Sequence, residues 1–265
     1  MDTAQYFCNR LSRQADYMAN HTHQEMLDQL NHLYSDTLAQ IIDQIVSKYE
    51  QLHSRWRPST VNDLLLYNKY IDQFRAIENI LNGCARQEYS IDNTELMNLY
   101  NEISHYNLTS YTPNTIRFGQ FEPDRAQQVV NSLWCSDGRH FSDRIWSNRI
   151  ELNNRLQQGL INCLTVGADK NTLTKTLRDT FNVSLYKADR IARTELTYVQ
   201  NQGIRDRYIA SGITKYKYLA AHDSRVSDIC RKLDGRVFNL SDARVGVNYP
   251  PMHCNCRSTV LAVVE

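Results

Sequence analysis

The first hundred residues repeat apolar side chains at steps of three and four, and this spacing constrains the fold more than any other feature of the chain. Polar residues fill the positions between them, so each segment has one apolar and one polar face. Because the average spacing is close to the helical period, it predicts amphipathic helices. The clearest stripe consists of Leu30, Tyr34, Leu38, Ile41, Ile45, Tyr49 and Leu52.

Two more helices are expected in this N-terminal half. Residues 58–60 are Pro-Ser-Thr, which marks a break followed by a helix start. A second helix then runs from about 64 to 81, with Gly83 as its stop, and a third runs from about 94 to 106. Packing of these stripes within the chain is the favoured interpretation, and docking against another protein is the alternative.

The helical pattern weakens after residue 106 and returns near residue 140. The stretch SYTPNTIRFGQFEPD holds two prolines and one glycine without a sustained period, which is typical of a linker or an ordered arm. Helices are then expected from Ser142 to Gly167, over the short stretch 168–181, and from Ser184 to Gly212. The two serines would cap these helices and the two glycines would end them.

The chemistry of the chain changes after residue 212. Three stretches rich in β-forming residues follow, namely ITKYKYLAA, GRVFNL and STVLAVV. The sequence therefore predicts an α+β fold that is mostly helical, with a helical N-terminal half and a short antiparallel sheet in a small C-terminal α+β domain. The expected organisation is a helical N-terminal region at 1–110, a linker at 111–139 and a C-terminal domain at 140–265.

Composition and charge narrow the class of protein. Hydrophobic residues make up 42% and charged residues 22% of the chain, so it can bury a core and general disorder is not expected. The net charge of +1 argues against a polycation for nucleic acid. The charge is uneven, however, because residues 184–265 hold 13 Lys and Arg against 8 Asp and Glu. This bias permits a phosphate-facing surface in the C-terminal part.

No targeting or membrane signal is evident. The N-terminus lacks an apolar core segment and a small-residue cleavage site, so we expect no signal peptide. No run approaches the roughly 18 apolar residues that a membrane-spanning helix needs. We expect a protein that is made and kept in a reducing cytoplasm, and its odd number of cysteines, seven, argues against a closed disulfide framework.

Cysteines and a histidine cluster near the C-terminus and suggest a metal site. Cys230, His253 and Cys256 offer two thiolates and one imidazole, which suit tetrahedral zinc. His253 and Cys256 can point the same way in a turn, whereas an extended strand would place Cys254 and Cys256 on one face. The alternatives are small buried cysteines near a turn and a catalytic cysteine–histidine pair. A fourth zinc ligand would come from Cys254, Asp223 or His222.

Two further motifs have a functional and a structural interpretation. In ARTELTYVQNQG, Glu195 is either a catalytic carboxylate or one of several buried polar anchors that tie its helix to the sheet, and the anchoring role is favoured. In KYKYL, Lys215 and Lys217 would contact phosphates, as would Arg225, while the tyrosines stack on bases. More often the tyrosines of such a strand pack inward and the lysines stay solvated. No residue set indicates catalysis, so we expect no enzyme.

Four stretches of the C-terminal half carry a resemblance to a known family. They are FSDRIWSNRIELNNRLQQGL, ADRIARTELTYVQNQG, YLAAHDSRVSDICRKLDGRVFNL and VGVNYPPMHCNCRSTV, which together span roughly Phe141 to Val263. In order and spacing they resemble the phage head morphogenesis family, the minor head proteins related to protein F of phage Mu. The helical first half fits the usual layout of that family more loosely.

The resemblance also bears on the candidate site. The family's ending typically reads D-x-R-x-C-x-x-C, then L-D-G-x-V-F, then P-P-x-H-P-x-C-R-C. Ser227 and Ser258 stand here at two common cysteine positions and Cys254 at a common proline, so a four-cysteine zinc site is excluded. A structural zinc on the two remaining cysteines and the histidine survives. The residues that match the pattern are Asp223, Arg225, Cys230, Leu233, Asp234, Gly235, Val237, Phe238, Pro250, Pro251, His253, Cys256 and Arg257.

The resemblance implies a low-copy minor capsid protein of a tailed phage that acts in head assembly and DNA packaging, with DNA delivery as a further role. Its partners would be the portal protein, the major capsid or scaffold proteins, and packaged DNA that it binds weakly and without sequence preference; no membrane is implied. It would lie inside the capsid near the portal, after assembly in the host cytoplasm. The helical N-terminal region would be the docking arm.

Two alternatives come from other classes. One is a domain or enzyme of a phage-derived polymorphic toxin, with ADP-ribosyl transfer or nuclease activity. Turnover of NAD or nucleic acid that is lost on Glu195→Gln would favour it. The other is a free DNA-binding module, which would show a steep salt dependence of its affinity.

Overall fold

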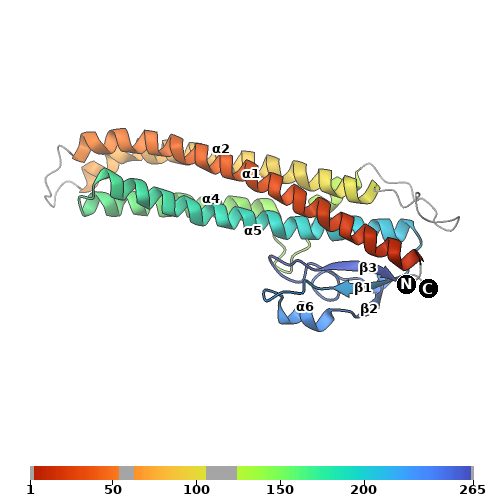
Figure 1. Cartoon of the computed structure of the whole chain (residues 1–265). Helices are drawn as coiled ribbons and strands as arrows, with labels where there is room; N and C mark the ends of the chain where they lie inside the picture. The colour runs from red at the N-terminus through yellow and green to blue at the C-terminus, as the bar shows by residue number, and fades with distance from the viewer. Residues whose placement is uncertain (1–2, 54–62, 106–123, 264–265) are drawn as a thin grey trace. The chain divides into compact units, whose positions relative to one another are not determined.

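The computed structural model describes residues 3–53, 63–105 and 124–263 (Figure 1). Most of them are helical, and a small antiparallel sheet forms near the C-terminus, so the predicted α+β class is confirmed. The helices are α1 (Thr3–His53), α2 (Asp63–His105), α3 (Arg125–Val130), α4 (Phe141–Thr165), α5 (Lys170–Ala210) and α6 (Asp228–Leu233). The strands are β1 (Lys215–Leu219), β2 (Val237–Asn239) and β3 (Thr259–Val263), and a 3₁₀ turn, Leu240–Asp242, follows β2.

Two predicted helix boundaries are wrong. Gly83 does not stop a helix, because α2 continues through it with buried Leu81 before it and buried Ala85 after it. Ser184 does not start a helix either, since it lies buried inside α5. At both positions the packing of an uninterrupted apolar face outweighs the local preference of one residue.

Other boundaries agree with the sequence. Gly167 and Gly212 follow the ends of α4 and α5 with φ of 66° and 70°, a left-handed conformation that favours glycine. All three predicted strands form. The Pro-Ser-Thr break at 58–60 lies outside the described residues, as does the part of the predicted linker up to residue 123, while α3 lies in the remainder of that linker.

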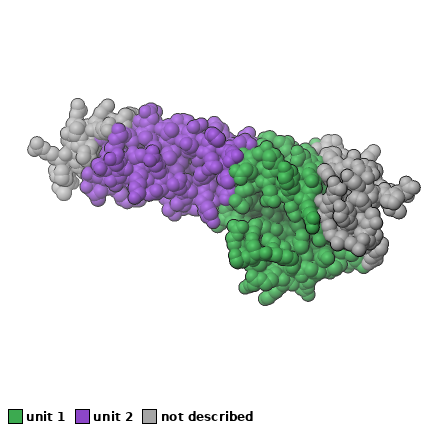
Figure 2. Space-filling model, in the orientation of Figure 1, with its two compact units in different colours: residues 1–26, 92–141, 190–265 green, residues 27–91, 142–189 purple. Residues whose placement is uncertain are grey.

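The chain divides into two compact units, each built from segments that are distant in sequence (Figure 2). Unit 1 comprises residues 1–26, 92–141 and 190–265, and unit 2 comprises residues 27–91 and 142–189. The helices α1, α2 and α5 each contribute to both units. The domain boundaries predicted at residues 110 and 139 divide the chain by sequence order, and they stay a prediction.

Unit 2 is a bundle of four helical segments, from α1, α2, α4 and α5 (Figure 1). The predicted stripe of α1 is buried at Leu30, Tyr34, Ile41, Ile45 and Tyr49, so intramolecular packing is the correct interpretation for these residues. The other three helices of unit 2 bury apolar side chains as well. These include Ile77, Leu81, Leu156, Leu160, Leu173, Leu177 and Phe181.

A buried polar network joins the four helices of unit 2. The Tyr34 hydroxyl donates to Glu88 at 2.9 Å, and the Asn148 side-chain amide donates to Tyr34 and to the backbone carbonyl of Ser184 at 3.2 and 3.0 Å. The Ser184 hydroxyl donates in return to the Asn148 carbonyl oxygen at 3.1 Å. Each helix supplies one member, so the network specifies the register in which the helices pack.

Unit 1 contains the sheet, whose strand order is β2-β1-β3 with antiparallel pairs throughout. Tyr216 and Tyr218 of β1 are fully buried on the core face, where Tyr216 pairs with Phe238 on β2 and Ala262 on β3. The Tyr208 hydroxyl of α5 accepts a hydrogen bond from the Ala262 backbone at 2.9 Å. The helix α5 therefore covers the outer edge of β3 and keeps it from pairing elsewhere. Across the described ranges, we find no helix with the length and apolar character that crossing a bilayer requires.

Candidate metal centre

Two short elements of unit 1 position the three predicted ligands. Cys230 lies on α6, whose N-cap Ser227 accepts a hydrogen bond from the Cys230 backbone at 3.3 Å. His253 and Cys256 lie in one turn, closed by a hydrogen bond from the Cys256 backbone to the His253 carbonyl at 3.2 Å. The turn interpretation of this segment is therefore correct, and the extended alternative is not.

The three side chains converge. The Cys230 sulfur lies 3.3 Å from Nε2 of His253 and 3.8 Å from the Cys256 sulfur, and all three candidate ligand atoms lie within 4.8 Å of one another. Ligand atoms bound to one tetrahedral zinc lie about 3.3–3.8 Å apart, given zinc–ligand bonds of roughly 2.0–2.3 Å. The described arrangement of two sulfurs and one imidazole nitrogen fits a zinc ion with little movement.

The histidine is also oriented for coordination. Nδ1 of His253 lies 2.8 Å from the Cys254 carbonyl oxygen. Because a carbonyl only accepts, Nδ1 carries the proton, which leaves the lone pair of Nε2 facing Cys230. A hydrogen bond from the second ring nitrogen to a backbone carbonyl is the usual support of a metal-binding histidine.

The hydrogen bond between Cys230 and Cys256 shifts the pKa values of the two thiols in opposite directions. The hydrogen bond from Cys256 lowers the pKa of the Cys230 thiol, which therefore ionises first. The same contact, together with burial, raises the pKa of Cys256. Tyr218 donates a hydrogen bond to the Cys230 sulfur at 3.4 Å, and burial raises the pKa of this phenol, so it remains a donor. The pair thus accommodates one negative charge readily, and a second would call for a cation.

The three candidates for a fourth ligand have other surroundings. Cys254 is exposed. Both carboxylate oxygens of Asp223 bind the guanidinium of Arg257, which lowers the pKa of Asp223. His222 is hydrogen-bonded to Asp234 at 2.8 Å. Among the described residues, the cluster of potential ligands contains Cys230, His253 and Cys256 alone.

Two serines complete the surroundings of Cys230. Hydrogen bonds from the Ser227 and Ser258 side chains also lower the pKa of its thiol. These serines occupy the positions at which the head morphogenesis pattern commonly has cysteines. Their proximity to Cys230 explains how that pattern gathers its cysteines around one point.

One face of α5 anchors the turn that carries two of the candidate ligands. The Thr194 hydroxyl accepts from the Asn255 backbone at 3.1 Å, and the Thr197 hydroxyl donates to the Cys256 carbonyl at 2.7 Å. The Asn201 side chain donates to the Ser258 carbonyl at 3.2 Å. Asn255, with φ of 58°, takes a left-handed conformation that asparagine tolerates. These contacts agree with the anchoring interpretation of ARTELTYVQNQG, although the two threonines were not singled out from the sequence.

Glu195, the other residue of that motif considered for chemistry, also has an anchoring contact. Its carboxylate accepts a hydrogen bond from the Trp134 indole at 2.8 Å, and Trp134 stacks on Tyr198 with ring centres 4.8 Å apart. Glu195 as a whole residue is 4% exposed. This environment holds the segment before α4 against α5.

In strand β1 the tyrosines pack inward and the lysines lie on the other face, which is the more common arrangement for such a strand. Tyr216 and Tyr218 are fully buried, so no base can stack on them. Lys215 and Lys217 lie on the opposite face and are partly exposed, and the Arg225 side chain is exposed. A nucleic acid at this surface would meet charge without aromatic stacking.

Comparisons with known proteins agree with this geometry. Residues 154–261 match the family model described as Phage Mu protein F like protein. This part of the chain is similar to the Mu protein F family. The matched region contains the anchoring face of α5, strands β1 and β2, most of β3 and all three candidate metal ligands, and the predicted resemblance is confirmed.

Two curated proteins extend the likeness beyond the Mu protein F region. The minor head protein GP7 of Bacillus phage SPP1 is 24% identical over 250 residues, which cover 84% of this chain and 78% of that protein. An uncharacterized protein of Haemophilus influenzae is 22% identical over 194 residues, which cover 73% of this chain and 41% of that protein. No solved structure matches the chain significantly.

Proposed function

We propose that this chain is a minor head protein of a tailed phage or of a related element integrated in a bacterial genome. The observation that supports this most strongly is the alignment with the SPP1 minor head protein, which covers 84% of the chain and so includes helices outside the Mu protein F region. In this proposal the chain is a structural component of the head and not an enzyme.

We further propose a position for the chain in the particle and a set of partner proteins. The chain would lie inside the capsid near the portal vertex, where it would contact the portal protein and neighbouring head proteins. The long helices support a docking role, because they offer extended faces on which another helical protein can pack. Co-expression of the full chain with the portal protein of the same phage, followed by size-exclusion chromatography, tests this partner. A shared peak is expected, and two separate peaks at micromolar concentrations would contradict the assignment.

Weak contact with packaged DNA is a further part of the proposal. Residues 184–265 have a charge balance of +5, and Lys215, Lys217 and Arg225 are accessible. Because binding would rest on phosphates alone, it should fall steeply with salt and ignore sequence. Fluorescence polarisation with two duplexes of unrelated sequence should give equal affinities, and Lys215→Gln with Lys217→Gln should reduce the salt slope by about 2. Salt-insensitive or sequence-specific binding would contradict this part.

We also propose a structural zinc held by Cys230, His253 and Cys256, with a water molecule or a neighbouring side chain completing the coordination. When bound, the ion would supply a crosslink between α6 and the turn before β3. Such a crosslink contributes directly to folding of a small sheet. The side chains already converge through hydrogen bonds, and the burial of Cys230 and Cys256 supports a structural role.

A further inference from the structure

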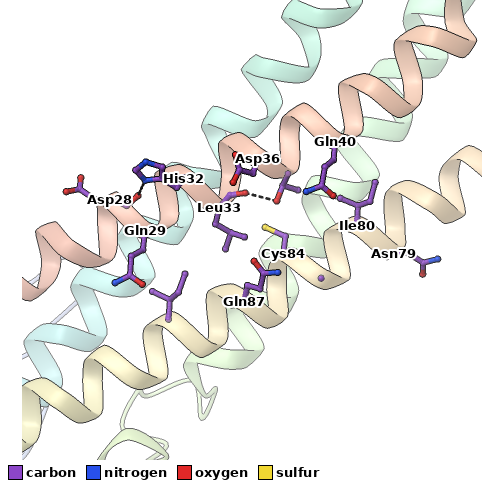
Figure 3. A pocket seen from close by; sticks show the side chains of 13 residues that line it. Asp28, Gln29, His32, Leu33, Asp36, Gln40, Asn79, Ile80, Cys84 and Gln87 are labelled. Atoms are coloured by element: carbon purple, nitrogen blue, oxygen red, sulfur yellow. Dashed lines mark hydrogen bonds between the residues drawn. The ribbon is translucent and has the colours of Figure 1, made fainter.

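A groove runs between α1 and α2 in unit 2 (Figure 3). It has a volume of about 670 Å³. Its α1 side spans residues 28–40 and its α2 side spans residues 79–91, so each side is about 18 Å long at 1.5 Å per residue. On each helix the lining residues recur at steps of three and four, which means that both walls are single helix faces.

The floor and the rims of the groove differ in chemistry. The floor is apolar or small, and Leu33 of α1 and Cys84 of α2 point into the space between the helices (Figure 3). The α1 rim carries Asp28 and Asp36, both exposed, and amide side chains line much of the remainder. No lysine or arginine is among the described residues that line it. The groove therefore combines an apolar floor with a negative rim.

A glycine inside the groove lacks an explanation within the chain. Gly159 and Gly203 also lie inside helices, and a Cβ on either would come within 3.0 Å of a neighbouring helix, at Thr176 and Ile103 respectively. A Cβ on Gly83 would meet nothing within 4 Å. Glycine inside a helix is destabilising relative to alanine, so the two packed glycines are explained by close helix approach and Gly83 is not.

We propose that this groove binds an amphipathic, basic α-helix of a partner protein, and that Gly83 leaves room for a large side chain of that helix. The proposal goes beyond the proposed function, because it assigns a surface and a partner chemistry without depending on where the protein acts. The two walls of the groove are helix faces about 18 Å long that lie side by side, and this length matches roughly three turns of a third helix. A lysine or arginine beside the partner's apolar stripe would face Asp28 and Asp36, which favours a basic helix over an acidic one. The same aspartates disfavour the phosphates of a nucleic acid.

Two synthetic probes test the proposal directly. Both are fluorescein-labelled helical peptides of 18 residues with the same leucine stripe, flanked by lysine in one and by glutamate in the other. Fluorescence polarisation with the full chain should give a dissociation constant for the lysine peptide that is at least about tenfold lower than that for the glutamate peptide. Equal binding of the two peptides, or binding of neither, would overturn the proposal.

Matched variants separate the groove from general effects. Gly83→Leu fills the groove and should abolish binding, whereas Arg86→Leu, an exposed position on the same helix outside the groove, should leave it unchanged. Asp28→Asn with Asp36→Asn should remove the preference for lysine, whereas Asp43→Asn with Asp179→Asn makes the same charge change on unit 2 outside the groove and should preserve it. Circular dichroism and thermal melting confirm that each variant is folded.

Two other occupants would show themselves in the same experiment. If the full chain forms a dimer that Gly83→Leu converts to a monomer, a second copy occupies the groove and the proposal is wrong. If labelled duplex DNA binds the full chain and Gly83→Leu abolishes that binding, the groove binds nucleic acid and the proposal is again wrong. Co-elution with the portal protein is a separate measurement, so failure of the peptide test and failure of the proposed function can be told apart.

Discussion

Cys230 contacts both other candidate ligands and a neighbouring tyrosine, so it is the residue at which the zinc proposal is tested. It contacts His253, Cys256 and Tyr218 within 3.8 Å. Protein purified without chelators should contain about one zinc per chain, and Cys230→Ser should reduce this to less than about 0.1. Ser258→Cys places a third thiol beside Cys230 and should slow zinc loss to a chelator.

A metal-free result would have a clear structural meaning. If wild-type protein holds less than about 0.1 zinc and Cys230→Ser costs only about 1–2 kcal/mol, the cluster is a packed turn without metal. Cys135→Ser serves as the control, because this half-buried cysteine lies outside the cluster. Its zinc content should equal that of the wild type.

Glu88 makes the stability of unit 2 dependent on pH. Burial raises the pKa of its carboxyl from 4.5 to about 7, against the hydrogen bond from Tyr34, which lowers it. As pH rises through this interval the unfolded chain loses the proton first, so the free energy of unfolding falls between about 4.5 and 7. Glu88→Gln stays neutral and should remove this fall, with a gain of up to ~3 kcal/mol above pH 7 and little change below pH 4.5.

Melting temperatures measured from pH 4 to 8 check this prediction. Glu102→Gln is the control, because this glutamate is exposed on the same helix. A Glu88→Gln profile parallel to that of the wild type would show that the buried carboxyl does not change its charge in this range.

At the scale of elements, the sequence predicted those features that follow from a repeated pattern. The stripe of α1 is buried because its period matches the helix, and the three strands form where β-branched and aromatic residues gather. Single-residue signals were less reliable. Gly83 and Ser184 lie inside continuous helices because long apolar faces on both sides are buried, and that information is spread over many residues.

The candidate site was predictable in its members and not in its surroundings. The sequence suggests Cys230, His253 and Cys256 as ligands of one zinc ion, and the structure brings their side chains together. The helix α6, which carries Cys230, was not predicted, although Ser227 followed by Asp228 is a usual helix start. The pairing of Asp223 with Arg257 joins residues 34 positions apart and left no local pattern in the sequence.

The helix α2 provides a test of why Gly83 is present. Gly83→Ala should stabilise the chain by ~0.5–1 kcal/mol, because alanine is the better helix former and its Cβ has open space. Gly203→Ala should destabilise it, since the same atom would come within 3.0 Å of Ile103. Urea unfolding curves measure both changes. Destabilisation by Gly83→Ala would mean that the chain itself needs the glycine, which would weaken the argument for a partner at this position.

At the scale of the whole molecule, the predicted docking arm cannot be removed as a separate piece. Residues 1–110 supply core side chains to both compact units, such as Leu30 and Ile77 in unit 2 and Leu99 and Ile103 in unit 1. A deletion would therefore expose the cores of both units and confuse loss of folding with loss of binding. Surface substitutions on the intact chain are the appropriate way to map its partners.

The central claim, that the chain is a minor head protein, is tested most directly by its presence in the particle. Virions and DNA-free procapsids purified from cells that produce the encoding phage can be analysed by quantitative mass spectrometry, with the portal and major capsid proteins as internal standards. The account predicts the chain in the particles at a copy number far below that of the major capsid protein. Its absence from both kinds of particle, with the portal protein present, would contradict the account.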